Sequence, residues 1–262
     1  MTTEPALLFE LREHVGTITF NRPHDLNTVN LDMARAMAAL ASKLPATLGM
    51  KAVVMRGAAK HFMAGGDIHA FHGEKRNVLP AISEIIDHFH AFVMCLQELP
   101  QPVVSCVRGV AAGGGFSLAI GADIIIADET AKFTPAYRKL GISPDGGGSF
   151  FLPRLVGTRK AMEMFLSGKT YGAQEARDMG LINAVAPNSD LDGKTREILD
   201  ELVSNSSMAS AATKQLLKGS ELEELRRHLD AEKASFLSLA GGTDFTEGVD
   251  AFLQKRNPAF RN

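Results

Sequence analysis

The chain has 262 residues, of which 45% are hydrophobic and 22% are charged. These values are ordinary for a soluble globular protein, and the length is sufficient for a substantial buried core. The 28 Lys and Arg residues nearly balance the 30 Asp and Glu residues, giving a net charge of -2, so no global basic field favours nucleic acid or an anionic membrane.

The N-terminal residues carry acidic side chains early and lack a continuous apolar segment, so we expect no export signal. Cys95 and Cys106 lie in apolar segments without metal-ligand spacing around them, which predicts reduced thiols. The longest near-apolar run, which ends at Asp123, is shorter than the roughly 20 residues of a membrane-spanning helix. We therefore expect a soluble cytoplasmic protein that binds neither membrane nor nucleic acid.

The first hundred residues alternate short apolar strands with helices. The expected elements are strands at 7–12 and 15–20, a helix at 33–44, a strand at 51–57 and a helix at 77–99. The first two strands form a hairpin, and either Asn30 or Asp32 caps the first helix. His88 and His90 are two positions apart on a helix, so they cannot face one metal ion together, and we expect no metal site.

Residues 102–128 are the stretch on which the rest of the chain is organised. A strand at 102–107 leads to three glycines at 113–115, followed by a helix at 116–120 and a second strand at 124–127. Glycine has no Cβ, so a bound group can approach the backbone there. The unpaired N–H groups and the helix dipole at this point favour a negative charge.

Two common anion-binding loops fit this stretch poorly. A phosphate-binding loop requires a lysine after its second glycine, whereas Gly115 and Phe116 follow Gly114. The dinucleotide pattern Gly-x-Gly-x-x-Gly/Ala requires a small residue at its last position, where this chain has Leu118, or Ile120 if the pattern starts later. The remaining interpretations are a turn whose amides hold a developing oxyanion, or a loop that merely lets a helix pack closely on a sheet.

A second glycine turn at 62–68 also follows an apolar strand and enters a helix. Two such turns can supply two amides that converge on one oxygen. The repetition suggests stacked strand-strand-helix units rather than one doubly wound sheet.

The second half of the chain is expected to form an α/β body up to residue 190 and a helical region over 191–262. Asp145 lies at a bend rich in Pro and Gly, beside the start of a helix through Phe150 and Leu152. A carboxylate in such a place is either a helix cap or a functional group, and the residues alone leave both open. The helical region must bury its apolar faces on the body or on another subunit.

Several patches, in matching order, carry a resemblance to a known family. They are Phe20–Pro23 with Asn27, Phe62–Ile68, Gly109–Gly115, Leu152–Gly157, Gly180–Ile182 and Glu247–Arg256. On these motifs the sequence resembles the enoyl-CoA hydratase/isomerase family, also called the crotonase family, over essentially its whole length. The resemblance implies a crotonase-type spiral of ββα units and a helical C-terminal region that mediates trimers or hexamers. It also implies an acyl-CoA thioester substrate, as in fatty acid metabolism, and no separate cofactor.

Carried over by position, the resemblance assigns the oxyanion donors to the backbone N–H groups of Gly66 and Gly114. Both belong to the turns identified above. Positions that line the adenine and pantetheine of CoA in relatives match His24, Leu26, Ala64 and Ile68. Lys255 or Arg256 is a candidate for contact with a CoA phosphate.

The departures from the family pattern bear on the reaction. Ser117 and Tyr137 stand where the hydratases carry two glutamates, and without those carboxylates simple hydration is expected to fail. Asp145 stands where dienoyl-CoA isomerases, ring-type 1,2-epoxyphenylacetyl-CoA isomerases and 4-chlorobenzoyl-CoA dehalogenase carry an aspartate. The run at 144–157 is most similar to the ring-type isomerases. One carboxylate suffices to move a double bond, provided that apolar neighbours raise its pKa. Tyr137, Phe150 and Phe151 are the candidates for that wall.

The favoured hypothesis is therefore an enoyl-CoA isomerase with Asp145 as acid and base. One alternative is a hydratase with replaced acid/base residues. Another is a dehalogenase-like hydrolase, in which His90 matches a histidine that activates water. The last is a non-catalytic CoA-ester binding subunit. We expect Tyr137, Ser117 and His90 to lie at the substrate.

Overall fold

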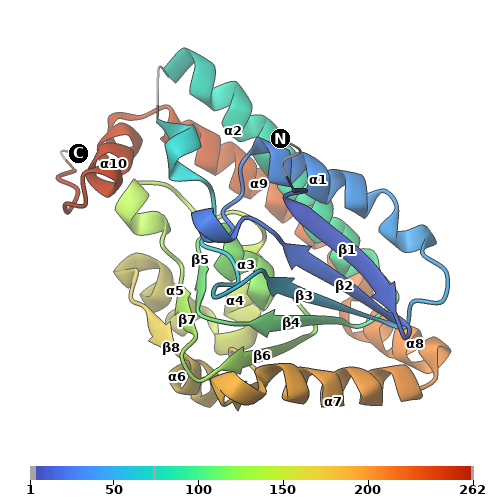
Figure 1. The fold of residues 1–262 in the computed structure, drawn as a ribbon. Coiled ribbons are helices and arrows are strands. Elements are labelled where there is room, and N and C mark those ends of the chain that lie inside the picture. Colours follow the sequence, from blue (N-terminus) through green and yellow to red (C-terminus); the bar gives the residue numbers. More distant parts are fainter. Residues whose placement is uncertain (1–3, 73–74, 261–262) are drawn as a thin grey trace.

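In the computed structural model, which describes residues 4–72 and 75–260, a six-stranded sheet and a three-stranded sheet are connected by helices (Figure 1). The large sheet has the order β1 (Leu7–Arg12), β2 (Val15–Phe20), β3 (Ala52–Gly57), β4 (Val103–Val107), β6 (Ile124–Asp128) and β9 (Ala184–Ala186). The small sheet has the order β5 (Val110–Ala112), β7 (Lys132–Thr134) and β8 (Tyr171–Gly172). β1 and β2 pair as the predicted antiparallel hairpin, and every other pair in the large sheet is parallel.

The chain passes repeatedly from the large sheet to the small sheet and then into a helix. β4 and β5 lead into α3 (Gly114–Ile120), and β6 and β7 lead into α4 (Gly148–Val156). β5 and β7 are parallel neighbours, so successive turns of the chain stack on one another. This is the spiral of ββα units that the sequence predicted.

The two faces of the large sheet are covered by different helices. α1 (Leu31–Ala41), α2 (Lys75–Glu98) and α9 (Leu222–Ala240) enclose the main core, and α7 (Leu191–Ser204) lies along the opposite face (Figure 1). β3 shows why both faces are covered, because Val53 and Met55 face the main core while Ala52 and Val54 face α7. A strand whose side chains are apolar on both faces must be covered by other elements on both faces of the sheet.

The helical region after residue 190 packs on the body through α7 and α9, while α8 (Ser207–Lys218) has no buried residue. α10 (Thr243–Leu253) packs near the segment at 137–140. α5 (Thr158–Ser167) and α6 (Ala173–Asp178) complete the body.

One described segment, Val78–Glu98 within α2, is long and apolar enough to cross a membrane by length and composition alone. The expectation that the longest apolar run ends at Asp123 was therefore wrong. Half of its most apolar window is buried inside the protein, where Phe92 and Val93 belong to the main core. Such burial is typical of the core helix of a globular protein.

Some local expectations differed from the structure. The turn at 62–68 leads into a short 3₁₀ helix, Ile68–Phe71, before α2 begins, rather than directly into an α-helix. The strands of the small sheet have only two or three residues, too few for an alternating pattern to be recognised. Asn30, one of the two predicted caps, accepts a hydrogen bond from the Met33 N–H, which settles the start of α1.

Candidate active site

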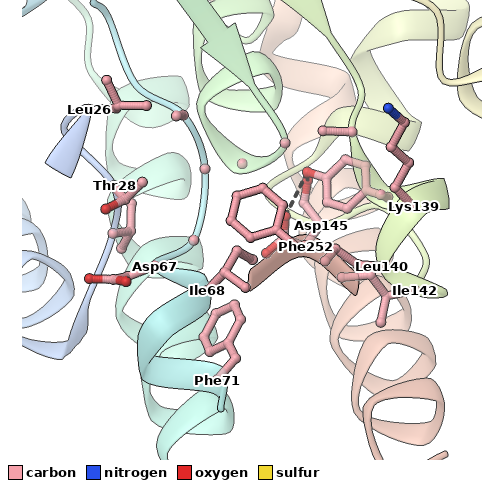
Figure 2. A pocket seen from close by; sticks show the side chains of 18 of the residues that line it. Leu26, Thr28, Asp67, Ile68, Phe71, Lys139, Leu140, Ile142, Asp145 and Phe252 are labelled. Atoms are coloured by element: carbon pink, nitrogen blue, oxygen red, sulfur yellow. Dashed lines mark hydrogen bonds between the residues drawn. The ribbon is translucent and has the colours of Figure 1, made fainter. Parts of the chain in front are cut away.

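A cavity of about 580 Å³ opens between the two glycine turns, α2, the segment 136–145 and the C-terminal helices. Figure 2 shows Asp145 on the opposite side of the view from Leu26 and Asp67. The wall is largely apolar; its apolar members include Ile68, Phe71, Ile82, Ile85, Ile86, Phe89, Ile142, Phe236 and Phe252. An apolar enclosed site strengthens the electrostatic interactions of the few polar groups in it.

The two glycine turns lie against each other at this cavity. The Ala112 N–H donates to the Met63 carbonyl over 2.9 Å, which ties the second turn to the first. A Cβ on Gly65, where φ is +85°, would lie 2.9 Å from the Ala112 carbonyl oxygen and 3.2 Å from the Gly114 nitrogen. Only glycine permits this approach and this φ.

The amides of Gly66 and Gly114 are free to bind a ligand. Both residues line the cavity, and within residues 4–72 and 75–260 neither N–H has a hydrogen-bond acceptor. On either side of Gly66, the Gly65 carbonyl and the Asp67 N–H are bonded to Val29, which holds the turn in place. Gly114 is the first residue of α3, where no helical acceptor exists. The pair can therefore stabilise an oxyanion.

The Asp145 carboxyl lies beside these amides. Its Oδ1 is 3.6 Å from the position that a Cβ on Gly114 would take. The same Oδ1 accepts a hydrogen bond of 2.7 Å from the Tyr137 hydroxyl, and the main-chain N–H of Asp145 itself is a further donor to the carboxyl. Burial raises the pKa of Asp145 to about 7, and the charge of Glu232 acts in the same direction, while the Tyr137 hydrogen bond opposes it. A carboxyl with this pKa can both take and return a proton near neutral pH.

Tyr137 and Ser117 form a chain of donors that ends at Asp145. Burial raises the pKa of Tyr137 well above 10, and the adjacent Asp145 charge adds to the shift, so the phenol keeps its proton. Because that proton points to Asp145, the Ser117 hydroxyl, 2.9 Å away, donates to the Tyr137 oxygen. Tyr137 lines the cavity, as predicted, whereas Ser117 is fully buried behind it and does not.

His90 supports the bend that carries Asp145. Its Nε2 accepts a hydrogen bond of 3.1 Å from the Gly146 N–H. Burial lowers the pKa of His90 to about 4, so the ring is neutral and its proton is on Nδ1. His90 does not line this cavity, and the predicted contact of His90 and Ser117 with substrate has no counterpart in its lining.

The apolar wall next to Asp145 differs from the expected one. Phe150 and Phe151 lie on α4 and line a separate hollow near α8. Phe89 of α2 takes their place, since its ring edge lies 3.4 Å from the Cβ position of Gly114 and 2.5 Å from that of Gly146. The helical spacing of α2 identified Phe89 only as a core residue, and no local signal placed it at the site.

The predicted CoA-binding positions lie together at the other end of the cavity. His24, Leu26, Ala64 and Ile68 all line it. Arg22 holds this end in place with a hydrogen bond to the Thr28 carbonyl and an ion pair of 3.0 Å with Asp67. Lys255 and Arg256 do not line the cavity. Within the described residues, no three His, Cys, Asp or Glu side chains are placed to hold a metal ion.

Known proteins of similar sequence and structure cover almost the whole chain. The sequence model of the family "Enoyl-CoA hydratase/isomerase" matches residues 10–262. The chain is 34% identical over 256 residues to 1,2-epoxyphenylacetyl-CoA isomerase of Escherichia coli (strain K12), with 97% of each chain covered. It is also 34% identical over 252 residues to a probable enoyl-CoA hydratase of Rhodobacter capsulatus, with 96% of each covered. The crystal structure of an enoyl-CoA hydratase from Mycobacterium avium subsp. paratuberculosis K-10 superimposes with a TM-score of 0.89 at 32% identity, covering 98% of this chain and 99% of that one.

The raised pKa of Asp145 predicts that the site destabilises the fold above neutral pH. Between about pH 4 and pH 7 the unfolded chain loses the Asp145 proton while the folded protein keeps it, so stability falls as pH rises. Asp145→Asn removes this contribution. Its stability advantage over the wild type should grow between pH 5 and pH 8 by up to about 2 to 3 kcal/mol, at roughly 1.4 kcal/mol per pKa unit.

Urea unfolding at the two pH values measures this difference. Asp230→Asn, a change at an exposed aspartate of α9, is the matched control and should show no pH-dependent gain. An equal effect of Asp145→Asn at pH 5 and pH 8 would contradict the raised pKa.

Proposed function

Since the chain belongs to the enoyl-CoA hydratase/isomerase family, we propose that it is an isomerase, which moves a carbon–carbon double bond in an acyl-CoA thioester. The observation that carries the proposal is a single carboxyl, Asp145, beside two unpaired amides, with Ser117 and Tyr137 in place of a second and third acid. Tyr137 keeps its proton, so Asp145 is the group at this position that exchanges one.

The reaction follows from the positions of these groups. The thioester carbonyl oxygen accepts hydrogen bonds from the Gly66 and Gly114 amides, and in a 3-enoyl thioester Asp145 removes a proton from the carbon next to that carbonyl. The electrons of the broken C–H bond move into the enolate, whose oxygen the two amides stabilise. Asp145 then returns the proton two carbons along, and the double bond has shifted with no net gain or loss of atoms.

Hydration is the second candidate, because several relatives carry hydratase names. It requires groups that orient water, take one proton and deliver another. Asp67 is the other acidic wall residue next to the glycine turn, and it is engaged with Arg22 and the His69 N–H. The dehalogenase alternative needs His90 as a base in the site, but the lone pair of Nε2 is already bonded to the Gly146 N–H.

We infer that the enzyme is a homotrimer or a hexamer. α8 buries no residue in the monomer, and it exposes Met208, Leu216 and Leu217. Apolar side chains gathered on one helix favour burial by another subunit. Sedimentation velocity should give a trimer or larger species, and a monomer at micromolar concentration would contradict this inference.

Isomerisation is tested with 3-enoyl-CoA and 2-enoyl-CoA substrates, both linear and aromatic, in deuterated water. The wild type should interconvert the positional isomers, incorporate deuterium and form no 3-hydroxyacyl product. Asp145→Asn should lose at least about 10²-fold in kcat, the usual contribution of a general base, and retain binding of the thioester. Formation of 3-hydroxyacyl-CoA as the main product would favour hydration, and retained turnover in Asp145→Asn would remove Asp145 from the mechanism.

The oxyanion site is tested at Gly66. A Cβ at this position would lie 2.8 Å from two ring atoms of Phe71, so in Gly66→Ala either the Phe71 ring or the turn with its amide must move. We expect kcat to fall by about 10² to 10³, the effect of losing one oxyanion donor, with KM little changed. Steady-state isomerisation assays of the variant measure kcat and KM.

The double variant Gly66→Ala/Phe71→Ala is the control, because it removes the clashing ring. It should recover part of the activity, with Phe71→Ala alone as its reference. Full activity in Gly66→Ala, in a variant whose NMR spectrum shows that the amide of residue 66 has moved, would exclude the Gly66 amide from the reaction.

A further inference from the structure

The position of Asp145 raises a question that the proposed function does not answer. An aspartate just before a helix ordinarily turns its carboxylate to the free N–H groups of the first turn. A carboxylate that accepts such bonds has a lowered pKa and is a weaker base. Asp145 lies two residues before Gly147, the N-cap of α4. Gly147 has no side chain that could accept hydrogen bonds from the first turn of the helix.

Each amide between Asp145 and Phe150 is already bonded to another group. The Gly146 N–H donates to His90, and the Gly148 N–H donates to the main-chain carbonyl of Asp145. The other two, those of Gly147 and Ser149, donate to the Oε2 and Oε1 of Glu232 over 2.7 Å and 3.0 Å. None of the amides of residues 146–149 is left for the Asp145 carboxylate, whereas its own main-chain N–H does bond to it and lowers its pKa.

Glu232 is a buried carboxylate on α9, 85 residues from Gly147 in sequence and only 5% exposed. Its Oε1 accepts a third bond, of 2.5 Å, from the Ser149 hydroxyl, which also lies 2.8 Å from His228 Nε2. A buried carboxylate is tolerated when donors satisfy it, and here the donors belong to the start of α4. Glu232 is therefore the cap of α4, supplied from a distant helix.

We propose that Glu232 is a positioning residue for the reaction: by occupying the N-terminal amides of α4, it keeps the Asp145 side chain turned to the cavity as the base. This inference rests on the proposed function. Without Glu232, the freed Gly147 and Ser149 amides compete for the Asp145 carboxylate. The negative charge of Glu232 also helps to hold the pKa of Asp145 high.

Titratable groups from three elements face Asp145, and all bear on its pH dependence. The 3₁₀ helix Tyr137–Leu140 contributes Tyr137, α9 contributes Glu232 and His228, and α2 contributes His90. Behind His90 lies the ion pair of Asp87 with Lys233, whose opposite charges act on His90 in opposite directions. Of these groups, Glu232 is the one whose charge raises the pKa of Asp145.

The test compares Glu232→Gln with the wild type by the pH dependence of kcat and kcat/KM for isomerisation. Glutamine has the same shape but one acceptor oxygen, so it cannot hold both amides, and it carries no charge. We expect the acidic limb of both profiles to move to lower pH by about one unit, because a like charge is removed and amides become available to Asp145. At pH 8, kcat should fall by about 10-fold to 10²-fold, as misplacement of a reacting group produces, with KM within about twofold of the wild type.

Glu223→Gln is the matched control, since Glu223 is exposed on the same helix and receives the same chemical change. Its profiles should equal those of the wild type. A Glu232→Gln enzyme with a lower melting temperature but an unchanged acidic limb would overturn the proposal and leave Glu232 a purely structural residue. If Glu232→Gln is insoluble, Glu232→Asp keeps the charge but is too short to hold both amides, and it should shift the limb by a smaller amount; no shift would overturn the proposal.

A ¹³C NMR titration of protein labelled at the aspartate carboxyl separates this inference from the proposed function. The Asp145 signal is the one that is absent in Asp145→Asn, and its titration needs no turnover. A wild-type protein that isomerises no thioester would contradict the proposed function. The difference in the Asp145 titration between the wild type and Glu232→Gln would still decide whether Glu232 sets the pKa of Asp145.

Discussion

The site depends on two backbone amides that line a cavity and that find no acceptor among the residues the structure describes. Folded proteins rarely leave such groups unpaired, because each loses the hydrogen bonds that it makes with water. Here the arrangement is imposed by neighbouring bonds: Val29 holds the residues on both sides of Gly66, and the Thr134 carbonyl holds the Gly113 N–H next to Gly114. The strands that fix these turns belong to consecutive units of the spiral. The ββα architecture thus brings together two turns that are distant in sequence. Their free amides supply the binding energy for a ligand oxygen.

The carboxyl opposite these amides is governed by a competition between burial and hydrogen bonding. Burial alone favours the protonated acid, the Tyr137 hydroxyl favours the carboxylate, and burial prevails, so that the pKa reaches about 7. A stronger set of donors would make Asp145 an ordinary structural carboxylate. The hydrogen bond from Tyr137 to Oδ1 fixes the orientation of the group. Function at this position therefore requires that the nearby donors be taken by other groups.

The two turns and Asp145 were predictable from sequence because each carries a local signal: glycines after an apolar strand, and an aspartate in a Pro-Gly bend. The hairpin and the long helices were predictable for the same reason, through their periodicity. The role of Glu232 was not predictable from sequence, since on α9 it is one of many charged residues of an amphipathic helix. It becomes a partner of Gly147 only through the tertiary fold. Phe89 was likewise assigned to a core helix, and His90 was expected at the substrate. Only the packing of α2 against the Asp145 bend reveals Phe89 as a wall and His90 as an acceptor for the Gly146 N–H.

The C-terminal helical region contributes to the site as well as to packing on the body. α9 contributes Phe236 to the cavity wall and, one turn earlier, Glu232 to the start of α4. A shift of α9 along its axis would therefore alter the cavity wall and the cap of the Asp145 bend together. Ser117 and Tyr137 act on Asp145 from the other side, as neutral donors. Asp145 is thus held between a donor chain from the body and an acceptor from the helical region. Both are needed, since the first orients the carboxyl and the second keeps the competing amides occupied.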